Sequence, residues 1–127
     1  MKKILLVDMN SSGLLKWINI LEKAGYKVYH SPAGYLEAIE AVLTVEPDII
    51  ICTPGSGYKR VSLEFLEILK QFQLKNNASI LYITSDENTR LEAIKVGVAD
   101  FLSENFSEDE LLLKCKALKI FDKIQII

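Results

Sequence analysis

Short apolar runs alternate with segments of helical period along the whole chain. Five runs have the character of strands, namely Ile4–Val7, Lys27–Tyr29, Ile49–Cys52, Ile80–Ile83 and Ala99–Leu102. Runs that are apolar without alternation are typical of strands covered on both faces, as in a parallel sheet. The pattern therefore predicts five buried strands.

The segments between these runs carry apolar residues at helical spacing. The residues at this spacing are, helix by helix, Leu14, Trp17, Ile18 and Leu21; Leu36, Ile39 and Leu43; Phe65, Ile68, Leu69 and Phe72; Leu91 and Ile94; and Leu111, Cys115 and Leu118. Leu91 and Ile94 of the fourth helix are expected to face inward. Gly25 and Gly97 are expected to close the first and fourth helices. The second helix, from about Tyr35 to Val45, ends before Pro47.

Residues 107–110, Ser-Glu-Asp-Glu, form a capping box that opens the last helix. Five strands alternating with five helices predict an α/β fold. Right-handed crossovers give a three-layer α/β/α sandwich around a parallel sheet. The expected order is the flavodoxin-like 2-1-3-4-5. Residues 1–122 are expected to form this domain, followed by an apolar tail at 123–127.

In such a sheet, ligands bind outside the carboxyl ends of the strands. The residues expected there are Asp8-Met9-Asn10, Thr53-Pro54-Gly55, Thr84-Ser85-Asp86 and Ser103-Glu104-Asn105. Any chemistry of the chain is therefore expected among these twelve residues.

Composition and charge narrow the classes of function. The 127 residues make one domain, half of them apolar and a quarter charged, with a net charge of −2. This charge offers no basic excess for nucleic acid. No apolar run approaches the ~18 residues of a membrane span. Cys52 and Cys115 are interpreted as buried thiols, with a disulfide as the lesser alternative, so a cytoplasmic location is expected.

Four stretches of the chain resemble the receiver domains of bacterial response regulators. Residues 4–8 (ILLVD) are similar to the first strand of that family, and residues 47–53 (PDIIICT) to its third. Residues 80–85 (ILYITS) are similar to the fourth strand, and residues 97–106 (GVADFLSENF) to the family's Gly-Ala-x-Asp-Tyr/Phe-x-x-Lys-Pro-Phe stretch. The four pieces are collinear and span the chain. The resemblance implies a CheY-like domain of two-component (phosphorelay) lineage.

In this family a histidine kinase's phosphoryl group passes to an aspartate at the end of the third strand. Mg²⁺ held by acids of the first strand assists the transfer, because negative charge accumulates. Here Thr53 stands at the acceptor position and Met9 at that of the second acid. An unactivated hydroxyl is a weak nucleophile, and a thioether is a poor Mg²⁺ ligand. Asp8 is the only remaining candidate metal ligand, so Mg²⁺ binding is expected to be weak or absent.

The remaining family positions are partly retained. Glu104 replaces the lysine that pairs with the phosphoryl group, and Asn105 replaces the following proline. Thr84 and Phe101, the hydroxyl and aromatic positions that move together in the family, are present. No acid occurs between Cys52 and Arg60 to replace the acceptor. The sequence therefore predicts a pseudo-receiver, with no aspartyl phosphorylation at this site.

The first functional hypothesis is a non-enzymatic domain that signals through protein contacts without phosphorylation. The resemblance places the output face on the fourth helix, fifth strand and fifth helix. The candidate residues of this face are Thr84, Asp86, Glu87, Arg90 and Phe101. The expected partners are proteins of a bacterial signalling pathway, and homodimerisation through this face is a further expectation.

The alternative is a flavodoxin-like domain that binds a small anionic ligand or a nucleotide at the strand edge. Backbone N–H groups of Asn10–Gly13 and Gly55–Arg60 would hold the anion. An ordinary helix N-cap and a surface loop explain these segments too, and Asp8 is also explained as a loop-bracing acid. His30 is the only histidine, so neither a histidine metal cluster nor a catalytic triad is indicated.

Overall fold

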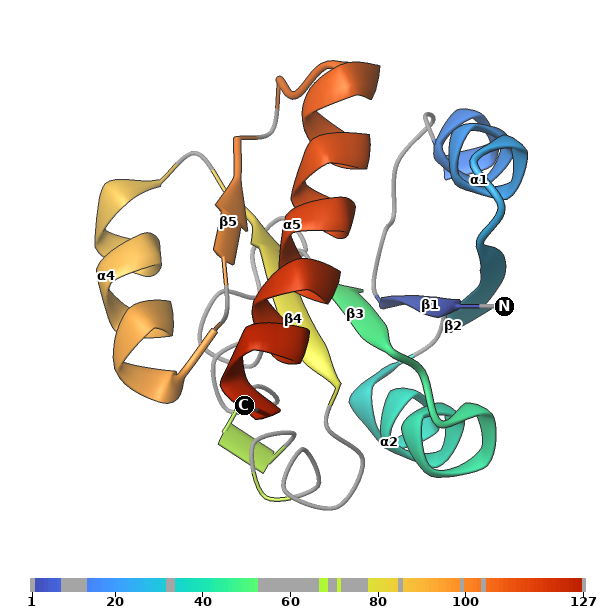
Figure 1. The fold of residues 1–127 in the computed structure, drawn as a ribbon. Helices are drawn as coiled ribbons and strands as arrows, with labels where there is room; N and C mark the ends of the chain where they lie inside the picture. The colour runs from blue at the N-terminus through green and yellow to red at the C-terminus, as the bar shows by residue number, and fades with distance from the viewer. Residues whose placement is uncertain are drawn as a thin grey trace.

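The computed structural model describes residues 2–7, 14–31, 34–52, 67–68, 71, 78–84, 86–98, 100–103 and 105–126, with the backbone alone at 34–36 and 119–126. Its elements, in chain order, are β1 (Lys3–Val7), α1 (Leu14–Lys23), β2 (Lys27–Ser31), α2 (Gly34–Val45), β3 (Ile49–Cys52), β4 (Ser79–Ile83), α4 (Glu87–Val96), β5 (Asp100–Leu102) and α5 (Glu108–Ile126). Figure 1 shows their arrangement. Most of the third predicted helix lies outside the described residues.

The five strands form one sheet in the order β2-β1-β3-β4-β5, and every strand pair is parallel. This confirms the predicted flavodoxin-like order. The three central strands are almost continuously apolar, and all nine residues of β3 and β4 are buried. Burial on both faces explains why the apolar runs in the sequence do not alternate.

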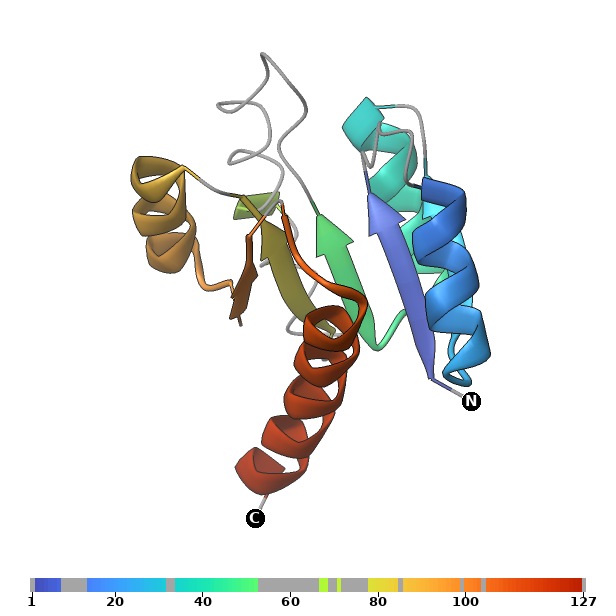
Figure 2. The ribbon, with the colours of Figure 1, turned by 90° about the horizontal axis from the view of Figure 1, so that it is seen from above.

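Helices cover both faces of this sheet, as the view from above shows (Figure 2). On one face, Leu21 of α1 and Leu111, Cys115 and Leu118 of α5 pack with Ile51 and other residues of the central strands. On the other face, Ala38 and Val42 of α2 and Ala93 of α4 pack with the alternate strand residues. The predicted three-layer sandwich is therefore confirmed.

The helix boundaries follow the predicted caps. Gly25 and Gly97 adopt the left-handed conformation after α1 and α4, with φ angles of 98° and 103°. Glycine adopts this conformation without the steric cost of a Cβ atom. α2 ends at Val45, before Pro47, and Glu46 between them has a φ of 52°. Glu46 thus occupies a backbone conformation that L residues other than glycine rarely adopt.

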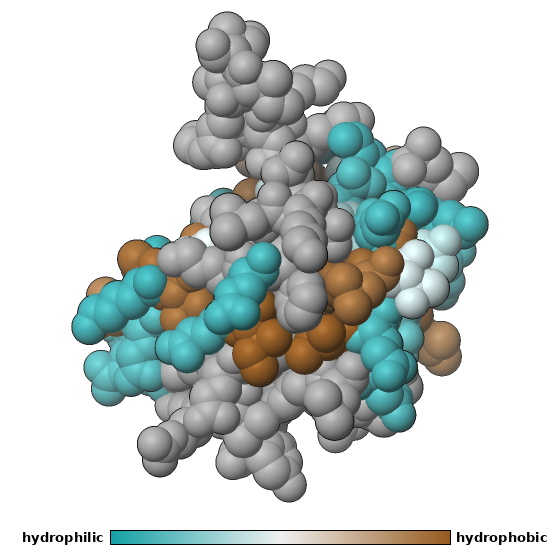
Figure 3. Space-filling view, turned by 90° about the horizontal axis from the view of Figure 1, so that it is seen from below, coloured by the Kyte–Doolittle hydropathy of each residue, from teal (hydrophilic) through white to brown (hydrophobic). Residues whose placement is uncertain are grey.

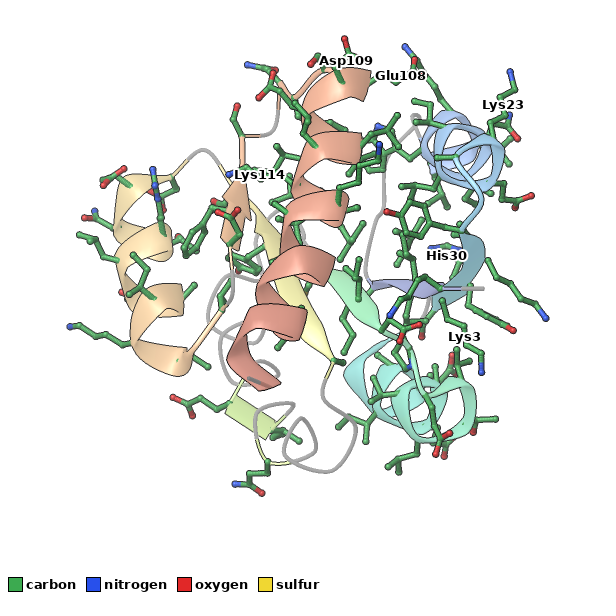
Figure 4. All side chains as sticks on the ribbon, viewed as in Figure 1. Lys3, Lys23, His30, Glu108, Asp109 and Lys114 are labelled. Atoms are coloured by element: carbon green, nitrogen blue, oxygen red, sulfur yellow. The ribbon has the colours of Figure 1, made fainter. Side chains whose placement is uncertain are left out.

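At the amino-terminal edge of the sheet, Lys3 ties β1 to the end of α2 (Figure 4). Its Nζ donates to the carbonyl oxygen of Val45 at 3.1 Å, and its backbone N–H donates to Oδ2 of Asp48 at 2.8 Å. A cation at a helix C-terminus satisfies a free carbonyl and offsets the negative end of the helix dipole. These bonds fix the turn that leads from α2 into β3.

The prediction of which α4 residues face the sheet is wrong. Leu91 and Ile94 are 51% and 52% exposed, while Thr89 and Ala93 are buried. The small Ala93 side chain lets the helix approach the sheet. Buried Thr89 donates its hydroxyl to Oδ2 of Asp86 at 2.6 Å, so its polar atom is satisfied.

Two further apolar residues at helical spacing, Leu43 of α2 and Ile68 of the third predicted helix, are exposed. On α2, the buried positions are Ala38 and Val42. Apolar side chains also gather in the middle of the surface seen from below, between hydrophilic stretches (Figure 3). Spacing of large apolar residues alone therefore misplaced parts of the buried faces of α2 and α4.

α5 continues without a break from Glu108 to Ile126, across the position expected to separate domain and tail. The apolar residues at helical spacing on this helix, Leu111, Cys115 and Leu118, are all buried. Both cysteines are buried, as predicted. Within the described ranges, no helix is long and apolar enough to span a membrane.

Candidate functional site

The sheet register brings the strand ends together at one edge. Val7, the last residue of β1, is paired with Cys52, the last residue of β3, and Cys52 is paired with Tyr82 of β4. On the other side of β4, Ile83 is paired with Leu102 of β5. Of the predicted site residues, Asp8, Met9, Thr53 and Glu104 lie outside the described residues. Thr84 and Asn105 are described, as are the residues expected on the output face.

Thr84 follows the last residue of β4 and is buried. Its backbone N–H donates to the carbonyl oxygen of Leu102 at 2.9 Å, which ties it to β5. Its hydroxyl oxygen Oγ1 accepts the backbone N–H of Asp86 at 3.2 Å. Asp86 is the N-cap residue of α4, and its carbonyl oxygen accepts the N–H of Arg90. Thr84 therefore connects β5 with the first turn of α4.

Phe101 of β5 is half-buried beside this turn. Its ring meets that of Tyr82 edge-on, with the centroids 6.5 Å apart and the planes at 81°. The guanidinium carbon of Arg90 lies over the ring of Phe101, 5.3 Å from its centroid. Edge-to-face ring pairs and cation–π contacts are both attractive. The sequence analysis named both residues but did not predict their contact.

Asp100 and Lys114 form an ion pair that the sequence analysis missed. Lys114 Nζ on α5 lies 2.9 Å from Oδ2 of Asp100 on β5, and Figure 4 labels Lys114 on α5. The other carboxylate oxygen of Asp100 accepts the backbone N–H of Phe101 at 2.8 Å. The two partners are fourteen residues apart and on different elements, so no spacing rule could have paired them.

A hollow of about 300 Å³ opens between α4, β5 and α5. Its lining combines hydroxyl, acidic, basic and aromatic side chains, namely Thr84, Asp86, Glu87, Arg90, Asp100, Phe101, Leu102, Ser103 and Lys114. Asp86, Glu87, Arg90 and Phe101 were all predicted for the output face, and the structure brings them together. Of these, Glu87 and Arg90 are exposed, whereas Asp86 and Phe101 are half-buried.

Exposed apolar side chains occur on the two helices that border this hollow. Leu91 and Ile94 follow Arg90 on α4 by one and four residues, and Leu113, 66% exposed, precedes Lys114 on α5. We call the surface made by Glu87, Arg90, Leu91, Ile94, Phe101, Leu113 and Lys114 the α4–β5–α5 face. Exposed apolar side chains on the same elements as a polar hollow suit non-covalent contact with another molecule.

Asn105 is exposed, and its backbone N–H donates to the hydroxyl of Ser103 at 3.2 Å. This bond braces the turn between β5 and α5.

Within the described part of the chain, no group of three or more His, Cys, Asp and Glu side chains could hold a metal ion. Burial raises the pKa of Cys115 to about 12, so its thiol is a poor nucleophile at neutral pH. Burial and the nearby Cys115 also raise the pKa of Tyr26.

No protein-family model matches the chain. Among solved structures, chemotaxis protein CheY4 of Vibrio cholerae superposes with a TM-score of 0.80 at 22% identity, over 93% of this chain and 98% of that chain. The CheY-like response regulator receiver domain protein of Methanospirillum hungatei gives a TM-score of 0.82 at 18% identity, over 98% of each chain. These similarities show a CheY-like receiver fold.

Two curated proteins are similar to this chain in sequence. The phosphate regulon transcriptional regulatory protein PhoB of Pseudomonas aeruginosa is 27% identical over 123 residues, which are 92% of this chain and 51% of that protein. The alkaline phosphatase synthesis transcriptional regulatory protein PhoP of Bacillus subtilis is 30% identical over 120 residues, 92% of this chain and 48% of that protein. The chain thus spans about half the length of both. The chain therefore has the CheY-like receiver fold, and its sequence is similar to about half of each of these two regulatory proteins.

Proposed function

We propose that this chain is a pseudo-receiver, a non-enzymatic signalling domain that acts through protein contacts without aspartyl phosphorylation. The observation that carries the proposal is the residue that follows β3. This strand ends at Cys52, in register with the end of β1, and the next residue in the sequence is Thr53 rather than an aspartate. A threonine hydroxyl without a general base does not replace a carboxylate as acceptor.

The donor set for Mg²⁺ supports the same proposal. After β1 the sequence supplies one carboxylate, Asp8, followed by Met9. Mg²⁺ prefers hard oxygen ligands in an octahedron, and a thioether does not provide one. Glu104 adds a negative charge where the family carries a lysine, so the phosphoryl group would also lose its cationic partner. These residues do not fit a Mg²⁺-assisted phosphoryl transfer.

The proposal is tested with acetyl phosphate and Mg²⁺, followed by intact-mass spectrometry. We expect no phosphorylated species of the native chain. A matched variant, Met9→Asp/Thr53→Asp/Glu104→Lys, restores the family's residues and is expected to gain one phosphoryl group. Amide NMR spectra with and without Mg²⁺ and beryllofluoride are the second measurement. Saturable shifts of Thr84 and Phe101 in the native chain would contradict the proposal.

The α4–β5–α5 face supports the protein-contact part of the proposal. The helices α4 and α5, which border the hollow, carry the exposed Leu91, Ile94 and Leu113, and exposed apolar surface is typical of interaction sites. We propose that a signalling protein, or a second copy of this chain, binds there. A partner that binds one state of the face more tightly than another would shift the population of the two states. This shift would then take the place of phosphorylation as the signal.

Sedimentation velocity over a range of concentrations tests the second copy as the partner. If copies associate through this face, Ile94→Glu/Leu113→Glu is expected to leave only monomer. Leu15→Glu is the matched control, because Leu15 is 76% exposed on α1, away from the face. If the native chain and both variants associate equally, the contact between copies lies outside this face. A native chain that is monomeric at every concentration would rule out the second copy.

The alternative of a small anionic ligand at the strand edge depends on residues 10–13 and 55–60, which lie outside the described residues. The hollow of the α4–β5–α5 face is lined by other residues. No observation favours this alternative, so it stays a prediction of the sequence.

A further inference from the structure

The position of the Phe101 ring depends on few neighbours. The ring is only half-buried, and the hollow beside it holds about 300 Å³, on the order of ten water molecules at their share of liquid volume. A side chain in a close-packed core keeps one rotamer because its neighbours exclude the others. Open space beside Phe101 removes part of that restriction, so individual contacts decide where the ring lies.

Arg90 provides one of these contacts from outside. Its guanidinium lies over the ring at 5.3 Å from the centroid, while Tyr82 meets the ring edge-on. Arg90 is exposed and Tyr82 is fully buried. The contact with Tyr82 is therefore on the core side of the ring, whereas the contact with Arg90 on α4 is within reach of another molecule.

Arg90 is also linked to the end of β4 through the first turn of α4. Its backbone N–H donates to the carbonyl oxygen of Asp86 at 3.0 Å, and the N–H of Asp86 donates to Thr84 Oγ1. Thr84 in turn donates its N–H to Leu102, the neighbour of Phe101 on β5. Together these contacts form a closed circuit, which runs from Phe101 to Arg90 on α4, through Asp86 to Thr84 at the end of β4, and back to β5 at Leu102.

We propose that Arg90 is a latch that holds Phe101 in its observed rotamer and so sets the state of the α4–β5–α5 face. This inference rests on the proposed function, since it names how binding at the face is regulated. A partner that binds the latched and released states with different affinity shifts the ring, the first turn of α4 and the Thr84 contact together. No phosphoryl group is needed for this switch.

NMR of the isolated chain tests the latch. The χ1 couplings of Phe101 and the NOE between the Phe101 and Tyr82 rings report the rotamer, and the Arg90 Hδ protons should show a ring-current shift that disappears in Phe101→Leu. Loss of an exposed cation–π contact changes a rotamer equilibrium by about two- to fivefold. We therefore expect Arg90→Gln to shift the equilibrium between the observed rotamer and a second one by about that factor, and the Phe101–Tyr82 NOE to weaken in proportion to the population lost.

Two variants serve as controls. Glu92→Gln changes an exposed α4 residue and is expected to leave Phe101 unchanged, whereas Arg90→Lys keeps the cation and is expected to fall between native and Arg90→Gln. A single unchanged rotamer in Arg90→Gln, in a variant whose thermal midpoint shows that it is folded, would overturn the latch. The measurement uses neither phosphodonor nor partner. Failure of the latch is therefore distinguishable from failure of the pseudo-receiver proposal.

Discussion

Ser107 and Glu110 cap each other at the start of α5. The N–H of Glu110 donates to Ser107 Oγ at 3.2 Å, and the N–H of Ser107 donates to Glu110 Oε1 at 3.3 Å. This reciprocal pair satisfies two backbone donors that a helix N-terminus leaves free. Figure 4 labels Glu108 and Asp109, the two acids between them in the first turn.

We expect Ser107→Ala to lower the free energy of unfolding by about 1 kcal/mol, the usual cost of losing an N-cap side chain. Urea unfolding followed by circular dichroism measures this change. Glu110→Gln is the matched control, because glutamine can also accept the bond from the Ser107 N–H. An Ala variant as stable as the native chain would show that the cap contributes nothing.

Replacing Glu46 with glycine is expected to stabilise the protein. Glu46 has a φ of 52° directly after α2, a conformation in which the Cβ atom costs about 1–2 kcal/mol. Glycine lacks this cost but loses more entropy on folding, so we expect a net gain of about 0.5–1 kcal/mol. Thermal unfolding measures the gain, and Glu46→Ala, which keeps the Cβ atom, should show none. An equal gain in stability in both variants would show that removal of the Glu46 carboxylate, and not relief of the backbone conformation, causes the effect.

His30 is expected to make stability depend on pH. Burial lowers the pKa of His30, and its Nε2 is buried without a hydrogen-bond partner among the described residues. The unfolded chain then binds the proton more readily than the folded chain. Stability should be complete above the unfolded pKa of about 6.5 and should fall as the pH drops through 6.5 toward the folded value.

The imidazole Cε1–H signal in an NMR titration reports the folded pKa directly, and we expect it below 6.5. His30 is the only histidine, so no other imidazole overlaps the signal. Urea unfolding at pH 7.5 and 5.5 gives the second readout. His30→Phe should reduce the difference between the two pH values, and a folded pKa above 6.5 would reverse the expected sign.

Cys115 is expected to resist alkylation in the folded chain. Its thiol is fully buried, and with a pKa of about 12 only about one molecule in ten thousand carries the thiolate at pH 8. Iodoacetamide should therefore modify Cys115 at least about a hundredfold more slowly in the native chain than in urea. Peptide mass spectrometry separates this residue from Cys52. Equally fast modification in both states would show that α5 opens readily.

Local sequence signals predicted much of the fold because they depend on neighbours in the chain. The β3 boundaries at Ile49 and Cys52 were predicted to the residue, and the Gly25 and Gly97 caps and the capping box were confirmed. Each depends on backbone conformation or on apolar burial within a few residues. The strand order followed from the alternation of elements and the handedness of crossovers.

The face of α4 could not be predicted in the same way. Its largest apolar residues, Leu91 and Ile94, share one side, yet Thr89 and Ala93 are the buried pair. Which side of a helix faces the sheet depends on how closely the helix can approach it and on polar partners such as Asp86 for Thr89. Neither condition is visible in the spacing of apolar residues.

The sequence by itself determined the parallel α/β architecture and the identity of Thr53 as the residue that follows β3, because periodicity and residue identity need no coordinates. Only the tertiary structure decided the contacts of the α4–β5–α5 face. It set Arg90 over Phe101 and paired Asp100 with Lys114, residues that the chain separates by eleven and fourteen positions. Such contacts depend on the relative placement of a helix and a strand at the end of the sheet, which arises only when the layers pack.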